Sequence, residues 1–244
     1  MLFNFIALVS CGVVIDSSRV NESINSLQQD DPNLVNYIKE HLLTPPPRFP
    51  ERIDEMDFLV KSVNADKDSE KYIARAALQA QYGQPLALEE LFNPILKQES
   101  DVKRFFIEAG AYDGVTGSNT LRLQLNPVWQ GLLVEPNPDS YESMVSRGRN
   151  AWTFPSCFST KTTPETVQFD SADILSGIIN EENSVKPGDG LRIHDEPLTL
   201  QCFPLYSILL ALGEYFGMYD QRSSGYSFSS GKFGILDILA FFLK

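Results

Sequence analysis

The chain has 244 residues and 43% hydrophobic content, which is enough to bury a core and argues against disorder along its whole length. Lys and Arg number 20 against 32 Asp and Glu, so the net charge is -12 and the pI is about 4.6. Nucleic-acid-binding surfaces need basic side chains to neutralise phosphates, so this balance argues against a nucleic-acid partner.

Residues 1–16 form an apolar segment that ends at Asp16. The run Phe5–Ile15 has the length of a signal-peptide core and is shorter than the ~20 residues that span a bilayer. No Lys or Arg precedes this run, so a buried first strand of a cytoplasmic protein stays open as the alternative to a signal peptide or short signal-anchor. Under the signal reading, Asn21 in Asn-Glu-Ser becomes a glycosylation acceptor.

Residues 17–102 are interpreted as a polar stretch, a Pro-rich linker and a helical extension. Apolar residues recur at helical spacing over 32–43, and the sequence TPPPRFP follows them as a semi-rigid linker. Further helices are expected within 52–98. None of these segments carries a recognisable catalytic motif, so a packing or anchoring role is expected for them.

The region 105–158 reads as strand, loop, helix, strand. The apolar run Phe105–Ala109 leads into a glycine-containing loop, and Ser118 is a candidate cap for a following helix. The sequences WQGLLVEP and NAWTFPSCFS supply two more strands. This order is typical of the opening of a Rossmann-like, mostly parallel sheet.

The residues of the glycine-containing loop after residue 109 indicate the charge of its ligand. Glu135 follows Gly114 by 21 residues, the spacing at which an acid in such folds binds ribose hydroxyls. The strict GxGxxG fingerprint is absent, and the acids Glu108 and Asp113 would repel a pyrophosphate. A cationic or zwitterionic ligand such as S-adenosylmethionine suits the loop better.

The sequences FFIEAGAYDG, SNTLRLQLNPVWQGLLVEPNPDSYESM and AWTFPSCFS resemble the FkbM-type methyltransferase-like domain, in particular its Star-like branch, over residues 103–212. The resemblance implies S-adenosylmethionine as cofactor. Glu108, Gly110, Asp113 and Gly114 would then shape the methionine side of its pocket, and Glu135 would hold the ribose. The alternative for these residues is structural, with glycines forming a turn and acids capping helices.

From residue 167 onward an edge strand, a loop, a strand ending near residue 204 and a short helix are expected. The resemblance implies that a further strand with acids should follow, and residues 213–244 form a divergent tail instead. A truncated product with an incomplete sheet is one explanation. The apolar run 235–243 is expected to pack as a strand or a helix and is too short to span a bilayer.

Cys157 and Cys202 lie in apolar strand-like segments. They could form a disulfide in an oxidising compartment and would be buried thiols in the cytoplasm. No CxxC motif or Cys/His cluster is present, so no metal site is expected.

Two functional hypotheses follow. The resemblance implies a Star-like protein of the secretory pathway with a non-catalytic methyltransferase-like domain, acting in ER-to-Golgi or endosomal trafficking of membrane-tethered growth-factor precursors. Its partner would be a membrane-bound cargo protein, with membrane association through the N terminus. The alternative is an S-adenosylmethionine-dependent O-methyltransferase of the FkbM type. No catalytic residue is assigned under either hypothesis.

Overall fold

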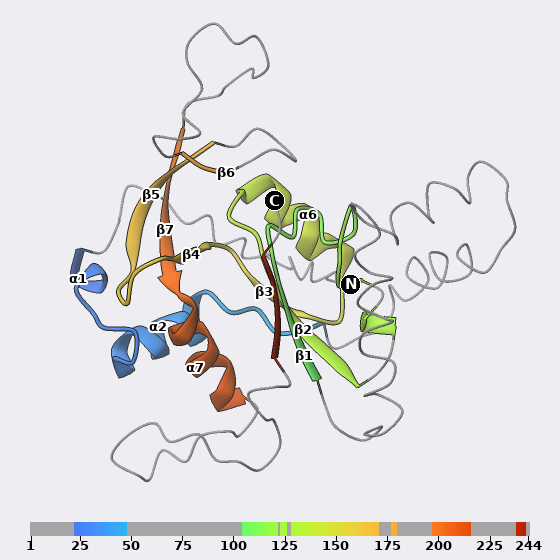
Figure 1. Cartoon of the computed structure of the whole chain (residues 1–244), viewed down its shortest axis with the longest axis horizontal. Helices are drawn as coiled ribbons and strands as arrows, with labels where there is room; N and C mark the ends of the chain where they lie inside the picture. Colours follow the sequence, from blue (N-terminus) through green and yellow to red (C-terminus); the bar gives the residue numbers. More distant parts are fainter. Residues whose placement is uncertain are drawn as a thin grey trace, which may run out of the picture.

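The computed structural model describes residues 22–47, 104–121, 123–125, 128–170, 177–179, 197–215 and 238–242, and these residues form a mixed α/β fold (Figure 1). Residues 1–16, Asn21 and the helices expected within 52–98 lie outside the described residues.

The first sheet is parallel throughout. Its strands are β1 (Arg104–Ala109), β2 (Trp129–Val134), β3 (Trp152–Phe154) and β8 (Ile238–Phe242), in the order β3-β2-β1-β8. The strands predicted from the apolar runs at 105–109 and 129–134 are therefore confirmed. The segment NAWTFPSCFS, expected as one strand, is divided: residues 152–154 form β3 and residues 157–159 form a strand of the second sheet. The run 235–243, which the sequence left open as strand or helix, provides β8 beside β1, so β1 has a neighbour on both sides.

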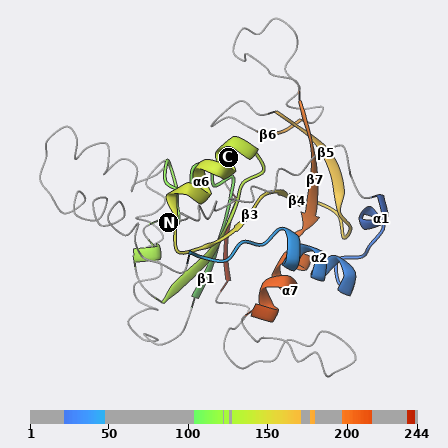
Figure 2. The same ribbon diagram turned by 180° about the vertical axis from the view of Figure 1, so that it is seen from behind.

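One face of this sheet is covered by two helices that are distant in sequence. The helix α2 (Pro32–His41) begins where Asp31 accepts the amide of Asn33, and α7 (Leu205–Tyr215) follows the second sheet directly. Figures 1 and 2 show α2 and α7 side by side, and the Ser207 hydroxyl donates to the carbonyl of Gln29 at 2.7 Å. The core on this face includes Leu34, Val35, Ile38, Phe105, Ile107, Leu132, Val134, Phe154, Phe203 and Ile208. The predicted helix at 32–43 thus shares a core with the sheet.

The opposite face of the sheet is covered by α6 (Pro138–Arg147), which the sequence reading did not anticipate. Asn137 caps its first turn by accepting amides from Asp139 and Ser140, and Gly148 ends it in the left-handed conformation with φ 62°. The core on this side consists of Phe106, Ala111, Leu123, Trp129, Leu133, Met144 and Ala151. Side chains alternate between the two faces along a strand, so successive residues of β1 and β2 pack against helices on opposite faces of the sheet.

The connection between β1 and β2 differs from the prediction. In its described residues the expected helix is reduced to the single 3₁₀ turn η3 (Leu123–Leu125). Ser118 does act as a cap, since its hydroxyl oxygen accepts the amide of Leu121 at 3.1 Å. The amide of Asn119 and the hydroxyl of Thr120 both donate to Glu108, which fixes the first residues in a non-helical arrangement.

The second sheet is mixed and comprises β4 (Cys157–Ser159), β5 (Glu165–Asp170), β6 (Gly177–Ile178) and β7 (Leu198–Pro204), in the order β4-β7-β5-β6. β4 pairs with β7 in parallel, whereas β5 is antiparallel to both β7 and β6. The strand expected at an edge is β5, and it instead lies between β7 and β6, although only its last two residues pair with β6. This antiparallel pairing departs from a purely parallel sheet.

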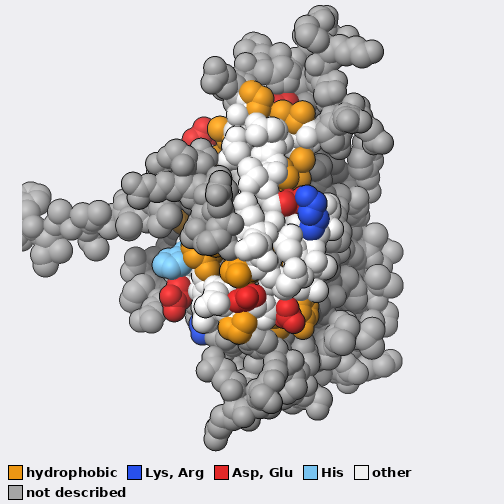
Figure 3. All heavy atoms as spheres, turned by 90° about the vertical axis from the view of Figure 1, so that its left-hand side faces the viewer, with side chains coloured by type: hydrophobic (Ala, Val, Ile, Leu, Met, Phe, Trp, Pro, Cys, Tyr) orange, Lys and Arg blue, Asp and Glu red, His pale blue; other side chains and the backbone are white. Residues whose placement is uncertain are grey.

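The side of the molecule that carries the short helix α1 (Glu22–Asn25) and strand β5 is seen in Figure 3. A surface of backbone and uncharged polar side chains runs down its middle, with hydrophobic side chains beside it (Figure 3). Along β5 the side chains of Thr166 and Gln168 are exposed. Among the described residues, β5 of the second sheet therefore has more exposed side chains than β1 and β2 of the first.

Candidate functional site

The loop that follows β1 folds back on the end of β2. Its glycines Gly110, Gly114 and Gly117 have φ values of 69°, 78° and 65°, which side chains other than glycine rarely adopt. The amides of Gly110 and Ala111 both donate to the carbonyl of Val134, at 2.9 and 3.0 Å. The order of glycines in this loop is thus explained by its backbone conformation alone.

Tyr112 is the only non-glycine residue with positive φ, 54°, among those described. Its amide donates to Oε2 of Glu135 at 2.7 Å, and the amide of Asn137 donates to Oε1 at 2.9 Å. Glu135 is buried, with 4% of its surface exposed. The acid predicted to bind ribose does lie against the glycine loop, and its carboxylate holds that loop to the start of α6.

Glu108, the second acid of the predicted pocket, lies at the end of β1 and is 3% exposed. Its carboxylate accepts hydrogen bonds from the Ser118 hydroxyl at 2.8 Å, the Asn119 amide at 2.9 Å and the Thr120 hydroxyl at 2.5 Å. Arg149 adds an ion pair at 3.3 Å. A carboxylate offers about four acceptor positions, so the chain itself supplies a full set of donors.

Arg149 is the residue at this site that sequence reasoning missed. Its guanidinium is buried and bonds to the carbonyl of Gly114 at 2.7 Å as well as to Glu108. Burial lowers the pKa of Arg149 from its ordinary value, and the charge of Glu108 opposes that shift. One feature of the sequence could have indicated such a partner. A buried acid at the end of a strand requires a cation, and few basic residues near this region of the sequence could supply it.

Asp113 also serves the loop itself. It accepts the amides of Val115 and Thr116 at 2.9 and 2.6 Å and the Thr116 hydroxyl at 2.8 Å, and Arg147 lies 3.4 Å away. Burial acts to raise the pKa of the Asp113 carboxyl, but these hydrogen bonds and the Arg147 charge hold it below its ordinary value. Asp113 is therefore an anionic turn cap.

The structure thus brings the five predicted pocket residues together at one end of the parallel sheet. The three acids are 3%, 7% and 4% exposed for Glu108, Asp113 and Glu135. Their hydrogen bonds run to donors of the same chain, and Oε2 of Glu135, the acid predicted to bind ribose, accepts the Tyr112 amide. The arrangement holds the loop after β1 to the end of β2 and to the start of α6.

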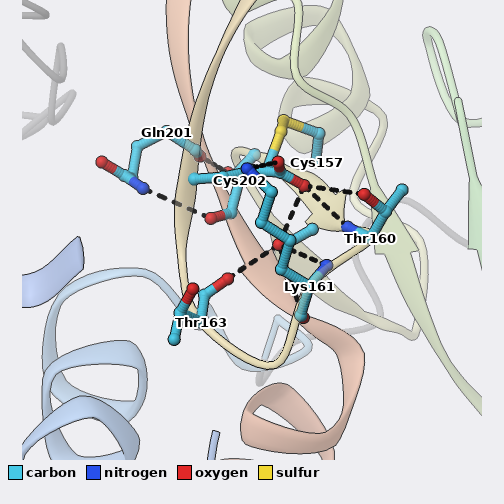
Figure 4. Close-up of a disulfide and its surroundings, with 9 residues drawn as sticks. Cys157, Thr160, Lys161, Thr163, Gln201 and Cys202 are labelled. Atoms are coloured by element: carbon cyan, nitrogen blue, oxygen red, sulfur yellow. Dashed lines mark hydrogen bonds and ion pairs between the residues drawn. A yellow bond between two sulfur atoms is a disulfide. The ribbon is translucent and has the colours of Figure 1, made fainter. Parts of the chain in front are cut away.

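The second candidate feature is the cysteine pair. Cys157 and Cys202 are joined by a disulfide, with Cα atoms 4.5 Å apart, and they are direct partners in the β4–β7 register (Figure 4). Beside it a polar turn forms, in which Glu165 accepts the Thr160 amide at 2.8 Å and pairs with Lys161 at 3.0 Å. The disulfide therefore ties β4 directly to the strand that leads into α7.

Comparison with protein-family models, with curated proteins and with solved structures found no match to this chain. Within the described residues, the helices are all too short or too polar to traverse a bilayer.

Proposed function

We propose that this chain is a Star-like protein of the secretory pathway, whose FkbM-type methyltransferase-like domain binds a protein partner in place of S-adenosylmethionine. Its cargo would be a membrane-tethered growth-factor precursor in ER-to-Golgi or endosomal transport. The observation that carries the non-catalytic part is the use of Glu108, Asp113 and Glu135 as acceptors for the chain's own donors. Such a domain retains the strands and the glycine loop of a cofactor site, but its acids bind groups of the chain itself instead of the cofactor.

The Rossmann-like part of the proposal is supported by the strand order. In a Rossmann half-sheet the first strand lies between the second strand and the strand that follows a crossover, and β1 lies between β2 and β8 in parallel. The glycine loop and Glu135 come directly after β1 and β2, at the carboxyl ends where ligands of such sheets bind.

The secretory part of the proposal is supported by the disulfide. Disulfides persist in oxidising compartments and are rare in cytosolic proteins. The cysteine pair is well shielded, with Cys157 7% exposed and Cys202 0% exposed. The apolar segment 1–16 and the Asn21 acceptor sequence agree with the same compartment.

One observation favours the O-methyltransferase as a second candidate. Glu135 and the Gly110 loop are adjacent, bonded through Tyr112, as a ribose-binding acid and its glycine loop would be. If the Tyr112 amide can release Glu135, the loop could admit S-adenosylmethionine. The two candidates therefore differ in whether the loop opens.

The deciding experiment is a calorimetric titration of the folded full chain with S-adenosylmethionine and S-adenosylhomocysteine. The proposal expects no heat of binding at micromolar ligand, because the acids are already occupied. Micromolar binding, about 8 kcal/mol of free energy, that disappears in Glu135→Ala would establish the methyltransferase candidate instead.

The compartment is tested separately by expressing the full chain in cells. We expect co-sedimentation with membranes and a shift in mobility on deglycosylation that Asn21→Gln removes. A pool that stays in the soluble fraction without glycan would contradict the secretory assignment.

A further inference from the structure

Arg149 follows α6 and reaches back into the loop after β1. Its side chain is 1% exposed, and its three nitrogens bond to different acceptors. Nε donates to Gln124 at 2.8 Å, and Nη2 donates to the Thr120 hydroxyl oxygen at 3.1 Å. Nη1 lies 2.7 Å from the Gly114 carbonyl, 3.0 Å from the Ser118 hydroxyl and 3.3 Å from Glu108.

These acceptors come from separate parts of the connection between β1 and β2. They include the strand end, the glycine turn, the capping serine and the 3₁₀ turn. The Phe106 ring adds a cation–π contact, with its centroid 5.7 Å from the guanidinium carbon. A planar group with donors on all edges fits such a set, whereas an ammonium ion, being a compact point charge, does not.

We propose that the loop between β1 and β2 is a guanidinium-binding site, which Arg149 of the same chain occupies. The negative charge of Glu108, which in sequence predicts a cationic ligand, is neutralised by this internal cation. This inference rests on the proposed function, in which the loop is closed to the cofactor. It names Arg149 as the residue that closes the loop. A buried cation with this many partners holds the loop shut in the absence of any ligand.

The test replaces Arg149 and supplies the missing group from solution. Arg149→Ala leaves the Glu108 carboxylate buried without its cation, so we expect the melting temperature to fall by roughly 10 °C. Millimolar methylguanidinium should restore part of that loss, and equal concentrations of methylammonium or sodium chloride should not. The matched control is Arg147→Ala, an arginine two residues away whose side chain is 43% exposed. This variant should melt within about 2 °C of the wild type and show no rescue.

A melting temperature of Arg149→Ala equal to the wild type, or a rescue matched by methylammonium, would overturn the proposal. A variant that does not fold gives no rescue curve, so a second measurement uses the wild-type chain. Hydrogen exchange without ligand should show the Asn119 amide, which donates to Glu108, protected as strongly as the amides of β1. Exchange of this amide as fast as in the exposed turn 160–163 would show that the loop is not held shut.

The two proposals fail in different ways. Binding of S-adenosylmethionine by the wild type would contradict the non-catalytic function and would leave the methylguanidinium rescue of Arg149→Ala unaffected. Absence of that rescue would contradict the guanidinium site and would leave the cofactor titration unchanged.

Discussion

The two sheets of this protein are stabilised by different means. The parallel sheet has helices on both faces, and its carboxyl end is closed by buried charged groups, Glu108, Glu135 and Arg149. The mixed sheet has exposed polar residues along β5 and is joined across β4 and β7 by a disulfide. A sheet covered on both faces gains its stability from apolar burial, whereas the mixed sheet adds a covalent bond to the burial of residues such as Phe203.

The comparison indicates which changes should destabilise each sheet. The parallel sheet tolerates little change in volume, because large side chains such as Phe106 and Trp129 are almost fully buried in it. The mixed sheet should tolerate added volume but should depend on the redox state of its cysteines. Three experiments test this contrast, from the largest expected effect to the smallest.

Removing the disulfide should have the largest effect. In the variant Cys157→Ala with Cys202→Ala, the 45-residue separation between the two sites no longer constrains the unfolded chain. The free energy of unfolding should fall by about 4 kcal/mol, measured by denaturant titration. Treatment of the wild type with a reductant should give a similar loss, and a loss below about 1 kcal/mol in both would show that the sheet does not depend on the bond.

A matched pair of glycine substitutions compares packing in the two sheets. A Cβ on Gly131 in β2 would lie 2.0 Å from the Phe106 ring, whereas no atom of the described residues lies within 4 Å of a Cβ on Gly177 in β6. Gly131→Ala should therefore lower the free energy of unfolding by about 3 kcal/mol, and Gly177→Ala should change it by less than about 0.5 kcal/mol. Equal effects at the two sites would contradict the contrast in packing. Combining Gly131→Ala with Phe106→Leu should recover part of the loss.

The smallest expected effect concerns acid stability of the mixed sheet. Burial acts to raise the pKa of Glu165, but hydrogen bonds from Lys161, Thr160 and Ser159 lower it from 4.5 to about 2. A carboxyl whose folded pKa is depressed adds stability above its unfolded pKa, and that stability is lost as the pH falls from about 4.5 toward 2. Glu165→Gln should flatten the pH dependence of the melting temperature in that window. The exposed Glu142 provides the control, since Glu142→Gln should leave the slope as in the wild type.

Local patterns predicted several elements well. The apolar run at 105–109, the proline stop after residue 43 and the run ending near residue 204 each correspond to an observed strand or helix boundary. The helix α6 was missed although its signals are local: Asn137 as cap, Pro138 in the first turn and Gly148 at the end. Reading Pro138 only as a break concealed a helix that begins there.

The candidate site was only partly readable from sequence. The spacing of Gly114 and Glu135 correctly placed the acid against the glycine loop, because the carboxyl ends of adjacent parallel strands meet at one edge. The spacing could not reveal that Arg149 fills the same loop, since an ion pair between residues 41 apart has no local signature. The spacing also could not reveal that α2 and α7 pack on the same face of the parallel sheet.

The sequence by itself determined the apolar strands and the glycine turns, because these depend on residues near one another in the chain. The adjacency of loop and acid followed from the expected order of parallel strands. Only the tertiary structure decided which donors bind the buried acids. It also decided that β8 pairs with β1 and that Cys157 lies opposite Cys202. Those pairings depend on the long-range packing of segments, and the free energy that selects them comes from burial and charge neutralisation across the whole domain.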